Sequence, residues 1–196
     1  MTGLVYPPEP AEILPLPTYD NPQGAASFGG AIVPVVNENG IVTARAPRAY
    51  VHGEAKLLHP VVHLHVVNSK GEIYLQKRSA IKEIFPLYWD TAVGGHIEYG
   101  ESVLEALYRE AREEIGLRDF NPVFLTEYVF QSQVDNELVF SYACVGDFQP
   151  DPDQIEVSEG RYWTEREIDE SFGKSILTPN FEKEFSMIRK ALQTLL

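Results

Sequence analysis

Cysteine and long apolar runs are nearly absent from this chain of 196 residues. The single cysteine, Cys144, excludes an intramolecular disulfide and fits a reducing cytoplasm. No apolar run approaches the roughly 20 residues that span a bilayer. The first twenty residues also lack the basic segment and apolar core of a secretory signal. We therefore expect a cytoplasmic protein that does not cross a membrane.

Basic residues are scarce as well. The chain has 16 Lys and Arg against 29 Asp and Glu, which gives a net charge of −13. This balance disfavours binding to the phosphate backbone of a nucleic acid. A small anionic substrate is still compatible with it, because a bound metal ion reverses the sign of the local charge.

The length and the 44% hydrophobic content fit one domain with a real core. Residues 1–30 contain six prolines and are expected to form an extended N-terminal arm, and residues 31–196 the domain itself. Alternating and apolar runs flanked by turn residues predict strands. The expected strands are 31–36, 41–46, 61–67, 72–76, 89–93, 123–131 and 138–145.

Three segments predict helices. Residues 101–115 lack Gly and Pro and carry an apolar stripe at helical spacing. Residues 164–172 begin with Thr164 and Glu167, the pattern of a capping box. The last helix has Thr178 as its cap and Pro179 in its first turn, and its apolar stripe begins at Phe181.

The most specific pattern lies between Gly95 and Leu117, GHIEYGESVLEALYREAREEIGL. Seven positions in it, each occupied by Gly, Glu or Arg, stand at fixed spacings, and a chance match is on the order of 10⁻⁶ at ordinary residue usage. Glu110, Glu113 and Glu114 fall at i, i+3 and i+4 of the expected helix and therefore share a neighbouring face. A hard divalent cation such as Mg²⁺ or Mn²⁺ would relieve their mutual repulsion.

The other positions of the pattern support this arrangement. Arg109 can hold one carboxylate by a bidentate pair. Glu101 stands at the helix start, where negative charge is favoured, and Gly116 is the expected terminating residue. Gly95, before the helix, allows close backbone approach.

This pattern resembles the box of the Nudix hydrolase family, and the resemblance extends from about residue 31 to about 195. It implies an α/β/α sandwich with a mixed β-sheet and Mg²⁺-dependent hydrolysis of a diphosphate linked to another group, X. By motif position it implies that Glu110, Glu113 and Glu114 bind metal and that Arg109 orients Glu110. The general base would be one of these glutamates or a carboxylate from a nearby loop. At family level the expectation is a homodimer.

A closer resemblance is to the isopentenyl diphosphate isomerase-like Nudix subgroup. It is carried by residues 32–96, and it implies a second metal site that suits a transition metal. The matching residues are His52, His59, His96, Asp135 and Glu137. His63 and His65 match nothing and are interpreted as structural or pocket-lining. The subgroup's Arg-Ser-x-x-Lys stretch implies that Arg78 and Lys82 hold substrate phosphate, with a solvated strand end as the equal alternative.

Two positions depart from the isomerases. Their catalytic cysteine is Gly94 here, and the aromatic residue expected after Thr178-Pro179 is Asn180. These departures favour hydrolysis of a nucleoside diphosphate linked to X, a small-molecule diphosphate. The alternatives are an isomerase-like enzyme acting on a prenyl diphosphate and a non-catalytic module that senses a nucleotide.

Overall fold

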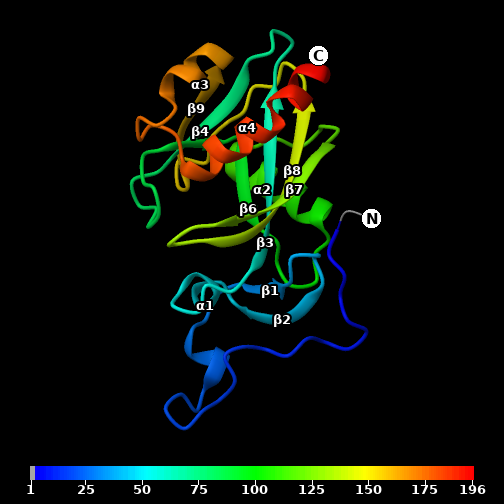
Figure 1. The fold of residues 1–196 in the computed structure, drawn as a ribbon, viewed down its shortest axis with the longest axis vertical. Coiled ribbons are helices and arrows are strands. Elements are labelled where there is room, and N and C mark those ends of the chain that lie inside the picture. Colours follow the sequence, from blue (N-terminus) through cyan, green and yellow to red (C-terminus); the bar gives the residue numbers. More distant parts are fainter. Residues whose placement is uncertain (1–2) are drawn as a thin grey trace. The chain divides into compact units, whose positions relative to one another are not determined.

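The computed structural model describes residues 3–196, which form a mixture of helices and strands (Figure 1). One sheet contains only β1 and β2, and the other has the order β5-β4-β3-β8-β7, with β6 paired to β3 and β9 to β4. The elements are η1 (Gly24–Ser27), β1 (Ile32–Val36), β2 (Val42–Pro47), α1 (Arg48–His52), β3 (His59–Val67), β4 (Ile73–Arg78), β5 (Trp89–Thr91), β6 (Val93–His96), α2 (Val103–Ile115), β7 (Val123–Gln131), β8 (Asn136–Val145), β9 (Val157–Trp163), α3 (Glu165–Ser171) and α4 (Pro179–Thr194).

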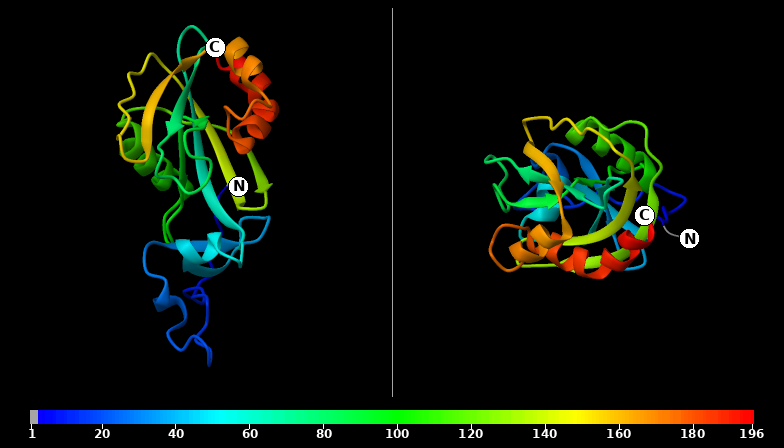
Figure 2. Two further views of the ribbon diagram at one scale, coloured as in Figure 1. Left: turned by 90° about the vertical axis from the view of Figure 1, so that its left-hand side faces the viewer. Right: turned by 90° about the horizontal axis from the view of Figure 1, so that it is seen from above.

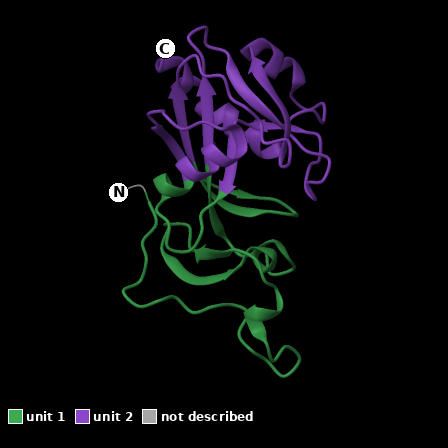
Figure 3. Ribbon diagram, turned by 180° about the vertical axis from the view of Figure 1, so that it is seen from behind, with its two compact units in different colours: residues 1–62, 96–106, 127–140 green, residues 63–95, 107–126, 141–196 purple. Residues whose placement is uncertain are grey.

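The chain divides into two compact units, coloured separately in Figure 3. Unit 1 comprises Met1–Val62, His96–Ala106 and Glu127–Phe140. Unit 2 comprises His63–Gly95, Leu107–Thr126 and Ser141–Leu196.

Unit 1 contains the hairpin of β1 and β2. The Asn37 side-chain oxygen accepts hydrogen bonds from the backbone of Asn39 and Ile41, at 3.0 and 3.1 Å, and this closes the turn that the sequence predicts. The N-terminal segment reaches the same hairpin through single bridges, Val5 to Ile41 and Ile13 to Arg45. Within unit 1 this segment is therefore paired with the hairpin at two places.

Unit 2 is built around a sheet whose core residues come from several elements. Strands β3, β4, β8 and β9 and helices α3 and α4 bury one apolar cluster, of which Phe181, Phe185 and Ile188 form the α4 side. These three residues belong to the stripe that the sequence predicts for the last helix. Both helix caps are confirmed: Thr164 makes a full capping box with Glu167, and the Thr178 hydroxyl accepts from Phe181 N.

Two adjacent glycines of β6 show which helix covers which face of the sheet in unit 2. A Cβ on Gly94 would lie beside His63, whose ring contacts Glu184 of α4. A Cβ on Gly95 would instead meet Glu110 of α2. Because successive residues of a strand point to opposite faces, α2 and α4 cover opposite faces of these strands. Figure 2 shows the same layering.

The element boundaries differ from the predicted ones in a few places. Helix α2 begins at Val103 rather than at residue 101, and the single strand expected at 89–93 is divided into β5 and β6. The sequence did not predict the short helix α1, which has five residues and no side-chain cap. Gly116 ends α2 with a φ of +65°, as expected of a C′ glycine. Within residues 3–196, no helix has the length and apolar character needed to cross a membrane.

Candidate functional site

Glu114 is a nearly buried carboxylate of α2, with 5% of its surface exposed. Its Oε2 accepts hydrogen bonds from Gln76 Nε2 of β4 at 3.0 Å and from the backbone N–H of Gly94 at 3.1 Å. Two donors on separate strands therefore fix this oxygen against the sheet of unit 2.

The environment of Glu114 opposes its ionisation. Burial, followed by the charge of Glu110, raises the pKa of Glu114 to about 8, although the Gly94 N–H and the charge of Lys82 act in the opposite direction. Without a cation, Glu114 is therefore mostly protonated at neutral pH. A divalent metal ion nearby would favour the carboxylate and release that proton.

Glu110 lies one helical turn earlier, against the backbone of β6. Burial raises its pKa, and the hydrogen bond from Arg109 Nη1 to Glu110 Oε1, at 2.8 Å, lowers it. A Cβ on Gly95 would lie 2.1 Å from Glu110 Cδ, so only glycine leaves room for this carboxylate. The predicted pairing of Arg109 with Glu110 is thus present.

Glu113 is oriented differently from the other two box glutamates. Its side chain is about half exposed and lies 3.4 Å from Arg109 Nη1. The same Arg109 Nη1 also donates to Glu110, so Arg109 lies between these two carboxylates. Within residues 3–196 the three box glutamates do not form a group with ligand atoms all within 4.8 Å of one another, so a shared metal ion would require side-chain rotation. Glu101, before the helix, accepts a hydrogen bond from Glu98 N at 2.9 Å.

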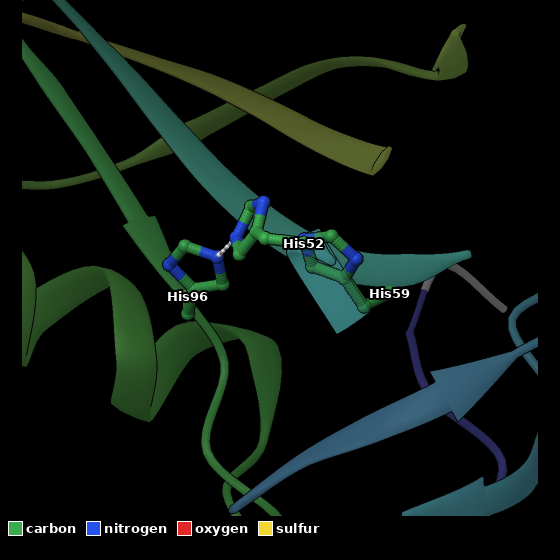
Figure 4. Close-up of side chains that lie close together, drawn as sticks. All are labelled: His52, His59 and His96. Atoms are coloured by element: carbon green, nitrogen blue, oxygen red, sulfur yellow. Dashed lines mark hydrogen bonds between the residues drawn. The ribbon is translucent and has the colours of Figure 1, made fainter. Parts of the chain in front are cut away.

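Unit 1 holds a cluster of three histidines (Figure 4). Within residues 3–196, this is the one group of three or more His, Cys, Asp or Glu whose potential ligand atoms all lie within 4.8 Å of one another. His52 comes from α1, His59 from β3 and His96 from β6. The Nε2 atoms of His52 and His96 are 2.7 Å apart, and Asp135 Oδ1 lies 3.3 Å from His52 Nδ1.

The tautomer of His59 suits metal binding. Its Nδ1 lies 2.8 Å from the carbonyl oxygen of Leu57, which can only accept, so Nδ1 carries the proton. Nε2 then has the lone pair, and it is buried without a hydrogen-bond partner. A backbone carbonyl that fixes the far nitrogen is the usual arrangement for a metal-ligating histidine. The cluster therefore fits a metal ion by its donor set and its orientation.

Arg78 and Lys82, predicted to bind phosphate, both contact carboxylates of unit 2. Arg78 Nη1 lies 3.4 Å from Asp90 Oδ2, and its Nε donates to the Ile84 carbonyl at 3.1 Å. Lys82 is paired with Glu156. A phosphate group would have to compete with these carboxylates for the two cations.

Comparison with known proteins identifies the family. The model of the NUDIX domain matches residues 57–181. The chain belongs to this family. It is 35% identical over 138 residues to an uncharacterized Nudix hydrolase of Nostoc sp.. The aligned residues make up 67% of this chain and 79% of that protein. It is also 30% identical over 142 residues to a protein of Kocuria rhizophila named isopentenyl-diphosphate Delta-isomerase, covering 69% of this chain and 79% of that protein.

Solved structures confirm the predicted Nudix α/β fold with a mixed sheet. A protein of Deinococcus radiodurans superposes with a TM-score of 0.65 at 25% identity, covering 75% of this chain and 91% of that one. A MutT protein of Methanosarcina mazei superposes with a TM-score of 0.55 at 22% identity. This match covers 65% of this chain and 89% of that one. The chain is thus an enzyme of the Nudix hydrolase family, whose members generally use divalent metals and act on small molecules that contain a diphosphate.

The two β6 glycines provide a matched pair of Nudix-site variants. Gly95→Ala is expected to displace Glu110. If Glu110 serves the reaction, as the box pattern predicts, turnover should fall about 10²-fold, because small misplacements of a catalytic group have effects of that size. Gly94→Ala places its Cβ at 3.5 Å or more from its neighbours and should keep the free energy of unfolding unchanged. Urea unfolding and steady-state kinetics of both variants test this. Full turnover by Gly95→Ala would show that Glu110 need not occupy this position.

His59 makes the stability of this Nudix protein depend on pH in the metal-free state. Burial lowers the pKa of His59 from 6.5 to about 4. The unfolded chain therefore binds more protons between these values, and the free energy of unfolding should fall by about 3 kcal/mol as the pH drops from 6.5 to 4. Urea unfolding in EDTA at several pH values measures the free energy of unfolding of the wild type and of His59→Gln. If this free energy falls equally with pH in the two proteins, His59 does not contribute to the pH dependence.

Sequence reasoning missed Gln76 and Glu184. Gln76 fixes Glu114 from the strand β4, and nothing in its sequence context distinguishes it. Glu184 is fully buried and contacts His63 and His65. A signal for it existed, since it falls three residues after Phe181, on the apolar face of the last helix. The interpretation of Cys144 as a core residue is confirmed.

Proposed function

We propose that this Nudix enzyme hydrolyses the diphosphate linkage of a nucleoside diphosphate joined to a group X, with Mg²⁺ or Mn²⁺ as cofactor. The observation that carries the proposal is Glu114, a buried carboxylate whose pKa is raised to about 8 and whose Oε2 is held by two donors. Carboxylates with a strongly perturbed pKa are more frequent at functional sites than elsewhere in a protein.

The roles of the box residues follow from their contacts. Glu110, Glu113 and Glu114 would hold the cation, which would polarise the phosphoryl oxygens when bound. Arg109 would orient Glu110 through its 2.8 Å hydrogen bond. Glu110 and Glu114 are the candidates for accepting the proton of the attacking water, since burial raises the pKa of both. Arg78 and Lys82 would exchange their carboxylate partners for phosphate oxygens.

The histidine cluster is proposed as a second, transition-metal site. His52, His59 and His96 supply imidazole nitrogens, and Asp135 lies against His52 as a further ligand or as its orienting carboxylate. Glu137, at the start of β8, completes the proposed set. Imidazole and carboxylate donors favour Mn²⁺, Zn²⁺ or Fe²⁺ over Mg²⁺.

An isomerase-like activity on a prenyl diphosphate is the second candidate, and the same histidine cluster favours it. Relatives named isopentenyl-diphosphate Delta-isomerase also occur in Photorhabdus laumondii and Mycolicibacterium vanbaalenii, at 27% and 31% identity. Against it, Gly94 carries no side chain that could transfer a proton. A nucleotide sensor without turnover is the third reading, and the complete set of box residues argues against it.

Several further expectations belong to this proposal. Residues 1–30 would act as an arm of a domain that spans residues 31–196, and two copies of the chain would form a homodimer. The enzyme would work in the cytoplasm on a small molecule and would not bind nucleic acid, in keeping with its net charge of −13.

A panel assay tests the proposal. Purified protein with Mg²⁺ or Mn²⁺ would be incubated with sugar nucleotides, dinucleoside polyphosphates and isopentenyl diphosphate, and the products would be separated by chromatography. Metal-dependent formation of nucleoside monophosphate supports hydrolysis, and EDTA should stop it. An allylic isomer formed from isopentenyl diphosphate would support the second candidate, and tight binding without any product would support the sensor.

A further inference from the structure

The N-terminal arm contacts the segment that joins β6 to α2, residues 97–102, which we call the box loop; both belong to unit 1. The Tyr6 hydroxyl accepts a hydrogen bond from the Gly100 N–H at 3.1 Å and donates one to the carbonyl oxygen of Glu101 at 3.2 Å. Burial raises the pKa of Tyr6, so the hydroxyl keeps its proton and can donate at neutral pH. One side chain of the arm therefore binds two consecutive residues of the box loop, and Glu101 is a position of the box pattern.

The hydrogen bond to Glu101 lies next to the cap of α2. The carbonyl of Glu101 shares a rigid peptide plane with the N–H of Ser102, so Tyr6 fixes the orientation of both groups. That N–H donates to Glu105 Oε2 at 2.8 Å, and Ser102 Oγ accepts from the Glu105 N–H at 3.3 Å. These reciprocal bonds form a capping box at the start of α2. Tyr6 therefore binds the peptide from which this helix begins.

Packing does not take the place of the Tyr6 hydroxyl at Gly100. Gly100 is exposed and has a φ of +99°, and a Cβ on it would meet no atom within 4 Å. The bonds between Glu98 and Glu101, from Glu101 N–H to Glu98 O at 3.0 Å and from Glu98 N–H to Glu101 Oε2 at 2.9 Å, are internal to the loop. Tyr6 thus supplies anchoring that this turn does not gain from packing around Gly100.

The arm is itself anchored before and after Tyr6. The Val5 N–H donates to the carbonyl oxygen of Gly40, in the hairpin turn, at 2.9 Å. The Ala11 N–H donates to the Tyr99 hydroxyl at 2.8 Å, and the Tyr99 ring packs edge-on against Tyr6 with ring centroids 5.4 Å apart. The hydroxyl of Tyr6 is therefore held by a backbone that is fixed on both sides.

We propose that Tyr6 is a positioning residue of the Nudix reaction, which fixes the start of α2 and thereby the placement of the box glutamates Glu110 and Glu114. Helix α2 is continuous over Val103–Ile115, so its start and these glutamates belong to one element. Because a displacement of about 1 Å can cost about 10²-fold in rate, a loosened helix start is sufficient to affect turnover. The kinetic part of this inference rests on the proposed hydrolase function.

Amide hydrogen exchange tests the positioning in the metal-free protein. Tyr6→Phe removes the hydroxyl and keeps the ring, and Tyr19→Phe is the matched control because Tyr19 is 99% exposed. In Tyr6→Phe the Gly100 and Ser102 amides should exchange about tenfold faster, as the loss of one hydrogen bond allows. The Ile97 amide donates to a carbonyl of β3 at 3.3 Å and should be unchanged. Equal exchange of Gly100 and Ser102 in the two variants overturns the proposal.

Steady-state kinetics with Mg²⁺ and ADP-ribose test the consequence for the reaction. Tyr6→Phe should lower kcat about tenfold and leave KM within about twofold, because geometry that serves the transition state is lost. A residue with only a structural role would lower the urea midpoint and leave the kcat of the folded enzyme unchanged. Tyr19→Phe should match the wild type in kcat, KM and urea midpoint.

Mn²⁺ binding gives a readout that does not need turnover. Water-proton relaxation would measure the affinity in the His59→Gln background, which lacks a ligand of the histidine cluster. Adding Tyr6→Phe should weaken Mn²⁺ binding about threefold or more, and adding Tyr19→Phe should not, because only the first displaces the box carboxylates.

The outcomes distinguish this inference from the proposed function. If the wild type hydrolyses none of the diphosphates, faster exchange and weaker Mn²⁺ binding in Tyr6→Phe would still support the positioning. If the wild type is a hydrolase and Tyr6→Phe keeps its kcat and Mn²⁺ affinity, Tyr6 is a structural residue and the proposal is wrong, while the hydrolase function stands.

Discussion

Glu114→Gln is expected to lower hydrolysis of the diphosphate substrate about 10³-fold or more while the fold is retained. Without metal the wild-type carboxyl is mostly neutral at pH 7, because burial raises its pKa to about 8. Glutamine reproduces this neutral form and its size, so the sheet loses little stability. Glutamine cannot become the anion that a divalent cation stabilises, so metal binding and proton transfer at this position are both lost.

The measurement is kcat and KM at saturating Mg²⁺, together with urea unfolding in EDTA. Glu170→Gln is the matched control, because it makes the same chemical change at an exposed position of α3 whose ion pair with Arg166 is on the surface. Turnover within a few-fold of wild type in Glu114→Gln would remove this carboxylate from the reaction. A large loss of unfolding free energy would make the kinetic result a consequence of misfolding.

The second large effect concerns the histidine cluster. His59→Gln should remove one equivalent of bound Mn²⁺ or Zn²⁺, with the affinity falling at least about 10²-fold, because His59 Nε2 is a buried donor with its lone pair already free of a proton. The pKa of about 4 means that metal binding at pH 7 displaces no proton from His59. Competition with a fluorescent chelator measures the affinity and elemental analysis the stoichiometry.

The two metal sites serve as controls for each other. Glu114→Gln should keep the equivalent bound by the histidines, and His59→Gln should keep the Mg²⁺ site of the box. Unchanged transition-metal affinity in His59→Gln would show that the three imidazoles are a structural cluster. Its 2.7 Å contact between His52 and His96 would then be an ordinary shared-proton hydrogen bond.

The sequence predicted best where local patterns determine the structure. Four features that depend on neighbouring residues only are found as expected. They are the helix caps at Thr164 and Thr178, the strand 123–131 and the terminating Gly116. The family resemblance also placed His96 in one set with His52 and His59, which lie far earlier in the sequence, and the structure brings the ligand atoms of all three within 4.8 Å.

Tertiary contacts account for what the sequence could not predict. The hydrogen bond from Gln76 to Glu114 joins residues 38 positions apart, and that from His63 to Glu184 joins residues 121 apart. No local pattern records such pairs. The outward orientation of Glu113 is another example, because helical spacing puts three glutamates on one face without fixing their side-chain rotamers.

The central claim is that water attacks a metal-bound diphosphate at the box carboxylates. The most direct measurement is ³¹P NMR of the reaction in ¹⁸O-labelled water, with Mg²⁺ and a sugar nucleotide such as ADP-ribose. We expect two phosphate-containing products, with ¹⁸O in one of them, and no products with Glu114→Gln. Cleavage without ¹⁸O on phosphorus, or equal product formation by the variant, would contradict it.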